Sequence, residues 1–144
     1  MKRVAIVGHE AAKFLPENEA LAREIIRSLL HGAYCVVSGA CHLGGVDVWA
    51  EEEAKALGLE CSIHPPRKLS WELGYKPRNI RIARDCSEAH CIVVRELPPS
   101  YQGMRFESCY HCGQARPAHI KSGGCWTCKY AEKLGKSALW HIVG

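Results

Sequence analysis

Four cysteines in the last third of the chain constrain it most, because their spacing is typical of a metal site. Cys109 and Cys112 form one CxxC pair, Cys125 and Cys128 form a second, and twelve residues lie between the pairs. Two such pairs that close one short loop are typical of zinc bound by four thiolates, which leave no coordination position for water. We therefore predict structural zinc bound by Cys109, Cys112, Cys125 and Cys128.

Other roles of these thiols stay open at the level of sequence. The four could remain free or act as a redox pair, because Cys125 lies at the start of an expected helix, where the pKa of a thiol is lowered. His111 and His119 lie inside the loop and could each replace a cysteine, although surface exposure or loop packing is the commoner role of such histidines. The odd total of nine cysteines argues against a full disulfide framework.

The composition predicts one domain that spans residues 1–144. The chain has 144 residues, of which 47% are hydrophobic, enough for one core. Its net charge of +4 fits an anionic ligand but falls short of the balance of a dedicated nucleic-acid binder. The first apolar run is too short for a signal peptide, and no stretch approaches the roughly 20 apolar residues of a membrane span. We expect a cytoplasmic protein with no membrane partner.

Strand and helix patterns alternate along the chain. Short apolar runs predict strands, and apolar residues at helical spacing predict helices. The expected strands are 3–7, 34–37, 61–64, 91–94 and 138–143, and the expected helices are 16–31, 46–57, 80–86 and 124–134. This order predicts a three-layer α/β/α fold with a parallel sheet of about five strands, in which ligands bind beyond the carboxyl ends of the strands. The irregular segment 97–128, which contains the cysteine pairs, is expected to be a small zinc knuckle inserted in the domain.

Three glycine-containing loops are expected at the carboxyl edge of this sheet. Gly8 follows the first strand, residues 38–45 follow the second, and residues 122–124 precede the last helix. Glycine lets backbone amides approach a phosphate, and a helix N-terminus favours its negative charge. Three such loops predict a phosphorylated ligand, whereas the lack of a GxGxxG or GxxxxGK[ST] motif disfavours a hydride-transfer enzyme or an NTPase.

The order of several short motifs resembles the SLOG superfamily of Rossmann-like nucleotide-binding proteins, which includes Lonely Guy phosphoribohydrolases and DNA-processing Smf proteins. The motifs that carry the resemblance are 4–8, 37–40, 44–51, 78–80, 82–83 and 122–124, with Thr127, Ala131, Gly135 and Lys136. The resemblance implies a Rossmann-like fold and a cleft that binds the phosphate and sugar of a nucleotide. The residues that it implies for this cleft are Ser38, Gly39, Gly44, Gly45, Asp47, Arg78, Asn79, Gly123, Gly124 and Thr127.

The chain departs from the family where Lonely Guy enzymes carry a catalytic glutamate. That motif is PGGxGTxxE, and Tyr130 stands at the position of its glutamate. Cleavage of an N-glycosidic bond needs an acid or a nucleophile at the sugar, so the loss argues against a simple hydrolase, and the catalytic residues are unknown. Asp47 or Glu51 could substitute by loop position. The phosphate loop is also altered by the insertion of residues 41–43 before its glycine pair.

Three classes of function are compatible with the sequence. The preferred one is a nucleotide-binding protein, such as a sensor, whose zinc knuckle rigidifies one wall of the cleft. The second is an enzyme that acts on nucleotides or nucleoside monophosphates. The third is a nucleic-acid-binding adaptor that uses Lys121, Lys129, Lys133 and Arg116. The resemblance also implies a homodimer, because SLOG proteins are often dimers.

Overall fold

The protein folds around one parallel five-stranded sheet. In the computed structural model, which describes residues 2–106 and 108–144, the strand order is β3-β2-β1-β4-β5 and all neighbouring pairs are parallel. The strands are β1 (Lys2–Gly8), β2 (Ala33–Ser38), β3 (Glu60–Ile63), β4 (Glu88–Val94) and β5 (Ser137–Val143). The predicted α/β class and the parallel sheet of five strands are confirmed.

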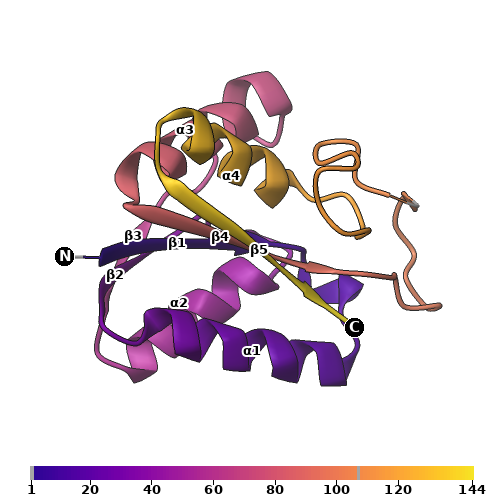
Figure 1. The fold of residues 1–144 in the computed structure, drawn as a ribbon, viewed down its shortest axis with the longest axis horizontal. Coiled ribbons are helices and arrows are strands. Elements are labelled where there is room, and N and C mark those ends of the chain that lie inside the picture. The colour runs from indigo at the N-terminus through magenta and orange to yellow at the C-terminus, as the bar shows by residue number, and fades with distance from the viewer. Residues whose placement is uncertain (1, 107) are drawn as a thin grey trace.

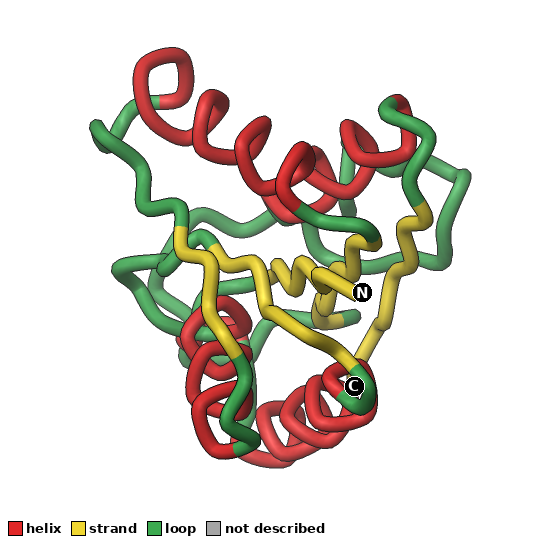
Figure 2. Tube along the Cα trace, turned by 90° about the vertical axis from the view of Figure 1, so that its left-hand side faces the viewer, coloured by secondary structure: helices red, strands yellow, loops and turns green. Residues whose placement is uncertain are grey.

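Two helices cover each face of the sheet, as Figure 1 shows, and the view in Figure 2 shows the strands between the two helical layers. The helices are α1 (Pro16–Leu30), α2 (Val46–Ala56), α3 (Lys76–Asp85) and α4 (Gly123–Lys133). Helices α1 and α2 pack together on one face, and α3 and α4 pack together on the other. The chain changes faces between β1 and β4, so the loops after these two adjacent strands diverge and leave a crevice at the carboxyl edge.

Sequence periodicity accounts for both cores. Pro16 occupies the first turn of α1, where its missing N–H costs nothing, and the helix buries Ala22, Ile26 and Leu30 at four-residue spacing. The strand β4 is buried almost throughout because its alternate residues enter opposite cores, Ile92 facing α1 and α2 and the preceding residue facing α3 and α4.

The main local difference from the expected elements lies before α3. This helix begins at Lys76 rather than residue 80, and a π-helical turn, η2 (Trp71–Tyr75), precedes it. Pro77 lies in the first turn of this helix, where proline is well tolerated. The second short turn, η1 (Ala11–Lys13), follows β1. No helix in the described parts of the chain is long and apolar enough to cross a bilayer.

Between β4 and α4, the described residues 95–106 and 108–122 form a long loop that lies beside the carboxyl edge of the sheet (Figure 1). The backbone N–H of Ile120 donates to the carbonyl of Val94 over 3.0 Å, which holds the end of the loop against β4. The guanidinium of Arg116 lies 3.7 Å from the ring centroid of Trp140 on β5. The last six residues of the expected insertion, 123–128, belong to α4.

Candidate ligand cavity and metal centre

A cavity of about 350 Å³ lies at the crevice between the ends of β1 and β4. Its size lies within the range of small-molecule sites. Seven of the eleven ligand residues that the sequence analysis named line it, namely Gly8, Asp47, Arg78, Asn79, Gly123, Gly124 and Thr127. The fold thus brings four separate segments of the chain to one cavity.

The other four named residues lie behind the cavity wall and shape it. The hydroxyl of Ser38 donates to the carboxylate of Glu51 over 2.6 Å and accepts the N–H of Ala40 over 3.2 Å, which fixes the loop after β2. Gly44 and Gly45 both have positive φ. A Cβ on Gly45 would lie 2.3 Å from the carbonyl oxygen of His9, so the glycine allows α2 to start against the loop after β1.

Arg78 and Asn79 form the floor of the cavity as a buried, hydrogen-bonded pair. The Nε–H of Arg78 donates to Oδ1 of Asn79 over 2.7 Å, and its Nη1 donates to the carbonyl of Gly39 over 2.7 Å. The side chain of Arg78 can approach the backbone here only because residue 39 is a glycine. A Cβ on Gly39 would lie 2.3 Å from Nη1 of Arg78 and 2.8 Å from Oδ2 of Asp47. A cation is therefore fixed in the floor, and the loop after β2 holds it.

Asp47 lines the cavity with a carboxyl group whose pKa is raised. Burial raises its pKa from 3.8 to about 6, the charge of Arg78 lowers it, and Glu51 raises it further. A carboxyl group whose pKa lies near neutral pH can give or take a proton under working conditions. Of the two carboxylates considered as substitutes for the missing glutamate, Asp47 lines the cavity, whereas Glu51 is bound to Ser38 behind it.

Two lysines add positive charge to the cavity. Lys13 and Lys121 both line it. Burial lowers the pKa of Lys13, the carboxylate of Glu10 opposes this effect, and the charge of Lys121 lowers the pKa further. Lys13 lies 3.8 Å from Glu10, which also accepts a hydrogen bond of 2.8 Å from the hydroxyl of Tyr101. Like charges held near each other in a cavity favour an anionic ligand.

His9 lines the cavity, but both of its ring nitrogens form hydrogen bonds within the protein. It is 2% exposed, and burial, followed by the charge of Lys13, lowers its pKa to about 3. The N–H of Val94 donates to Nδ1 over 3.1 Å, so Nε2 carries the proton and donates to the carbonyl of Lys121 over 2.9 Å. The neutral imidazole therefore joins the ends of β1 and β4 to the segment before α4.

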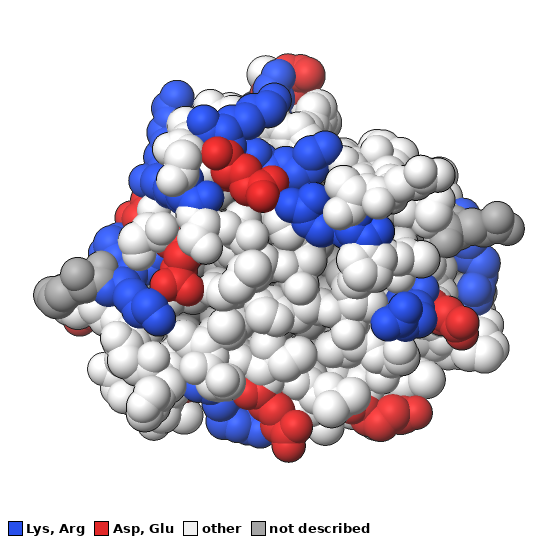
Figure 3. All heavy atoms as spheres, viewed as in Figure 1, with Lys and Arg blue, Asp and Glu red and all other residues white. Residues whose placement is uncertain are grey.

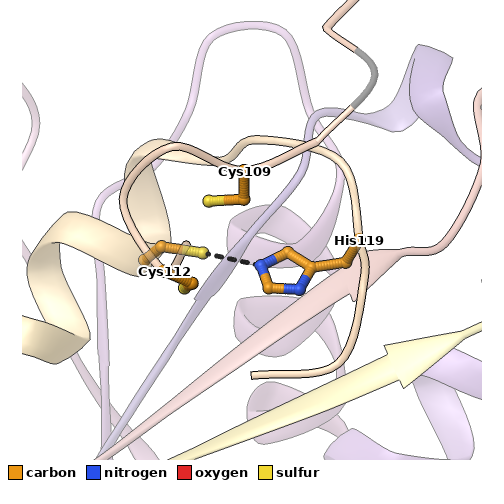
Figure 4. A group of neighbouring side chains, drawn as sticks. Cys109, Cys112 and His119 are labelled. Atoms are coloured by element: carbon orange, nitrogen blue, oxygen red, sulfur yellow. Dashed lines mark hydrogen bonds between the residues drawn. The ribbon is translucent and has the colours of Figure 1, made fainter. Parts of the chain in front are cut away.

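The long loop and the start of α4 bring four metal-ligating side chains together. One ligand atom each from Cys109, Cys112, His119 and Cys125 lies within 4.8 Å of the others, and all four residues are buried. Figure 4 shows Cys109, Cys112 and His119 gathered inside the loop. Three thiols and one imidazole form a donor set known from structural zinc sites.

The surroundings of these side chains fit a bound metal ion. Nδ1 of His119 donates to the carbonyl of Pro117 over 2.7 Å, which leaves the lone pair of Nε2 directed at the thiols, 3.5 Å from Sγ of Cys125. A ligating histidine in proteins normally donates its other N–H in this way. The indole N–H of Trp140 donates to Sγ of Cys125 over 3.3 Å.

Electrostatics also favour a cation at this place. Burial and the neighbouring sulfurs of Cys125 and Cys109 raise the pKa of Cys112 to about 12. Burial alone would raise the pKa of Cys109 as well, but backbone N–H groups of Cys112, Ser122 and His111 lower it. A bound cation would allow all three thiols to ionise.

Cys128 lies outside this group, although the sequence spacing named it as a ligand. It is fully buried one turn further along α4, among the residues that pack between α3, α4 and the sheet. His111 also lies outside the group, and its carbonyl accepts a hydrogen bond from Lys129. The sequence allows His119 to replace a cysteine, but the regular spacing of the two cysteine pairs favours Cys128.

The structure does not support a reactive thiol at the start of α4. The thiol of Cys91, 3.9 Å away, and burial raise the pKa of Cys125, whereas its position in the first turn predicts a lowered one. None of the nine cysteines forms a disulfide bond in the structure.

Comparisons with known proteins show the fold. No protein-family model and no curated protein matches the chain. The X-ray structure of DNA processing protein A from Streptococcus pneumoniae is similar over 97% of this chain, with a TM-score of 0.61 and 17% sequence identity. The chain spans 50% of the length of that protein. This similarity shows the fold, which agrees with the Rossmann-like fold that the sequence resemblance implies.

Proposed function

We propose that the chain binds a nucleotide or a nucleotide-derived ligand in the cavity between β1 and β4. The convergence of separate glycine-containing segments with a buried arginine carries this proposal. Gly8, Gly123 and Gly124 lie at the cavity together with Arg78. Backbone amides at the start of a helix and fixed cations are the groups that bind phosphate in other proteins.

The charges around the cavity support an anionic ligand. Lys13 and Lys121 lie near the start of α4, and their mutual repulsion would be relieved by a phosphate. Glu10 offsets one of these charges, and Arg78 in the floor adds another.

We propose zinc as the metal bound by the long loop, with Cys109, Cys112, His119 and Cys125 as ligands and with a structural role. Four protein ligands leave no open position on the metal, so the ion would supply a cross-link and no reaction. The link matters for the cavity because residues 121–124 line it and lie between the ligands His119 and Cys125. Native mass spectrometry of protein kept reduced should show one zinc ion per chain, and protein free of metal would refute this part of the proposal.

Isothermal titration with AMP, GMP, CMP and UMP tests the ligand. We expect at least one of them to bind, and Lys121→Gln to weaken binding at low salt. Lys121 bonds His9 through its backbone carbonyl, so the substitution keeps this hydrogen bond. It removes the charge, together with the contacts of the ammonium group with the rings of Phe106 and Tyr110. Lys55→Gln is the matched control, because Lys55 lies exposed on α2, away from the cavity. Failure of all four nucleotides to bind would refute the proposal.

The same samples test the enzyme alternative. Release of free base from the bound nucleotide, abolished by Asp47→Asn, would assign the protein to the second class of function, with Asp47 as the acid or base at the sugar. Binding without release of base supports a sensor or carrier.

A nucleic-acid-binding role is a second candidate, favoured by the distribution of charge. Helices α3 and α4 together carry six basic residues (Lys and Arg) and two acidic residues (Asp and Glu). Helices α1 and α2 together carry three basic residues and seven acidic residues. Figure 3 shows Lys and Arg gathered where α3 and α4 lie in the same view in Figure 1. A polyanion bound to this face would be released steeply by salt. Binding of single-stranded DNA that does not depend on salt would refute this role.

A further inference from the structure

The cavity has one aromatic wall in addition to its cationic groups. Trp71 and Tyr75, both from the turn η2, line it. Trp71 is 41% exposed although it is a large hydrophobic residue, so one part of the ring remains open to solvent. Exposed tryptophan at the mouth of a cavity is typical of a ligand contact.

Neighbouring rings hold Trp71 in place. The ring of Trp126 on α4 lies perpendicular to it, with 5.2 Å between centroids, and Trp126 stacks on Tyr130 at 5.3 Å. Both separations are typical of favourable aromatic pairs. Trp126 is absent from the described cavity lining and supports Trp71 from α4.

The other aromatic ring at this wall is fixed as well. The guanidinium of Arg78 lies 5.5 Å from the ring centroid of Tyr75, and Arg78 is itself hydrogen-bonded to Gly39 and Asn79. A wall that is ordered before binding loses little conformational entropy when a ligand arrives.

We propose that Trp71 forms a base-stacking subsite, so that the ligand is a nucleotide bound through its planar base as well as its phosphate. This inference rests on the proposed nucleotide-binding function. A base has a π-face that stacks on an indole, whereas a sugar phosphate has none. The cationic groups Lys13 and Lys121 come from the loop after β1 and the segment before α4, while Trp71 comes from the segment before α3. One cavity therefore offers separate groups for the two ends of a nucleotide.

Isothermal titration with a nucleoside monophosphate and with ribose 5-phosphate separates the contribution of the base to binding from that of the sugar phosphate. The nucleotide is whichever of AMP, GMP, CMP and UMP binds wild-type protein most tightly. We expect Trp71→Ala to weaken binding of this nucleotide by roughly 5- to 100-fold, and to change the affinity for ribose 5-phosphate by less than about twofold, because that ligand has no base to stack. Trp71→Phe should restore most of the lost affinity.

Leu73→Ala is the matched control, since Leu73 lies on the same turn, is 65% exposed and is not among the cavity residues. It should leave both affinities unchanged. Equal effects of Trp71→Ala on both ligands, or no effect on the nucleotide, would overturn the stacking subsite while leaving nucleotide binding intact. Failure of every nucleotide to bind wild-type protein would overturn both proposals.

Discussion

Replacing Asp47 with asparagine tests whether the ionised carboxylate of Asp47 destabilises the folded protein. Burial raises the pKa of Asp47 from 3.8 to about 6, so between these values the folded protein keeps a proton that the unfolded chain has released. The unfolded state then binds fewer protons, and stability falls as pH rises. The difference between the two pKa values corresponds to about 3 kcal/mol above pH 6.

Asparagine resembles the protonated carboxyl group and can still accept the N–H of Cys41 that now lowers the pKa of Asp47. We therefore expect Asp47→Asn to be more stable than wild type at pH 8, by up to about 3 kcal/mol, and the gain to vanish near pH 4. Urea unfolding at several pH values between 4 and 8, followed by circular dichroism, measures this gain.

Asp85→Asn provides a control with the opposite sign. Burial alone would raise the pKa of Asp85, but hydrogen bonds from His64, Ser62 and Arg3 hold it below its usual value. This carboxylate therefore stabilises the fold above the unfolded pKa, and the variant should be less stable than wild type at pH 8. If Asp47→Asn also loses stability at pH 8, the attraction between Asp47 and Arg78 outweighs burial and the reasoning is wrong.

Three other predictions concern the metal centre, the sheet and the basic face. His119→Ala should lose bound zinc by native mass spectrometry, whereas Cys128→Ala should keep it at a cost of about 1 kcal/mol; the reverse result would restore the four-cysteine site. Gly8→Ala should lower the free energy of unfolding by about 3 kcal/mol, because the new Cβ would lie 2.0 Å from the carbonyl oxygen of Ile92. Gly123→Ala is the control: its Cβ would meet no atom within 4 Å, so the free energy of unfolding should change by about 0.5 kcal/mol or less. If α3 and α4 bind DNA, replacing Arg84 and Lys133 with glutamine should lower the salt dependence of binding by roughly two charges, and an unchanged salt slope would place DNA elsewhere.

The fold was predictable because its signals are local. Most strands are short apolar runs, and three of the four helices, α1, α2 and α4, end shortly before a glycine. Gly32 follows α1 and Gly58 follows α2. Both glycines have positive φ, which favours glycine over other residues. The alternation of these elements leaves few topologies other than a parallel sheet with both faces covered.

The candidate metal centre was only partly predictable, because its fourth side chain depends on how the loop folds. Cys109 and Cys112 lie in the loop and meet one sulfur of the second pair, as the spacing indicates. Cys128 lies one turn further along the helix, in the core, while His119 is brought in by the end of the loop that pairs with β4. Sequence spacing contains no information on that pairing.

The cavity and the metal centre share one segment of backbone. His119 and Cys125 lie at its two ends, and residues 121–124 between them line the cavity. The imidazole of His9 ties the middle of this segment to β1 and β4 through the carbonyl of Lys121 and the N–H of Val94. Because these bonds and the four proposed metal ligands act on so few residues, a bound metal ion would let a loop with little apolar surface of its own form an ordered cavity wall.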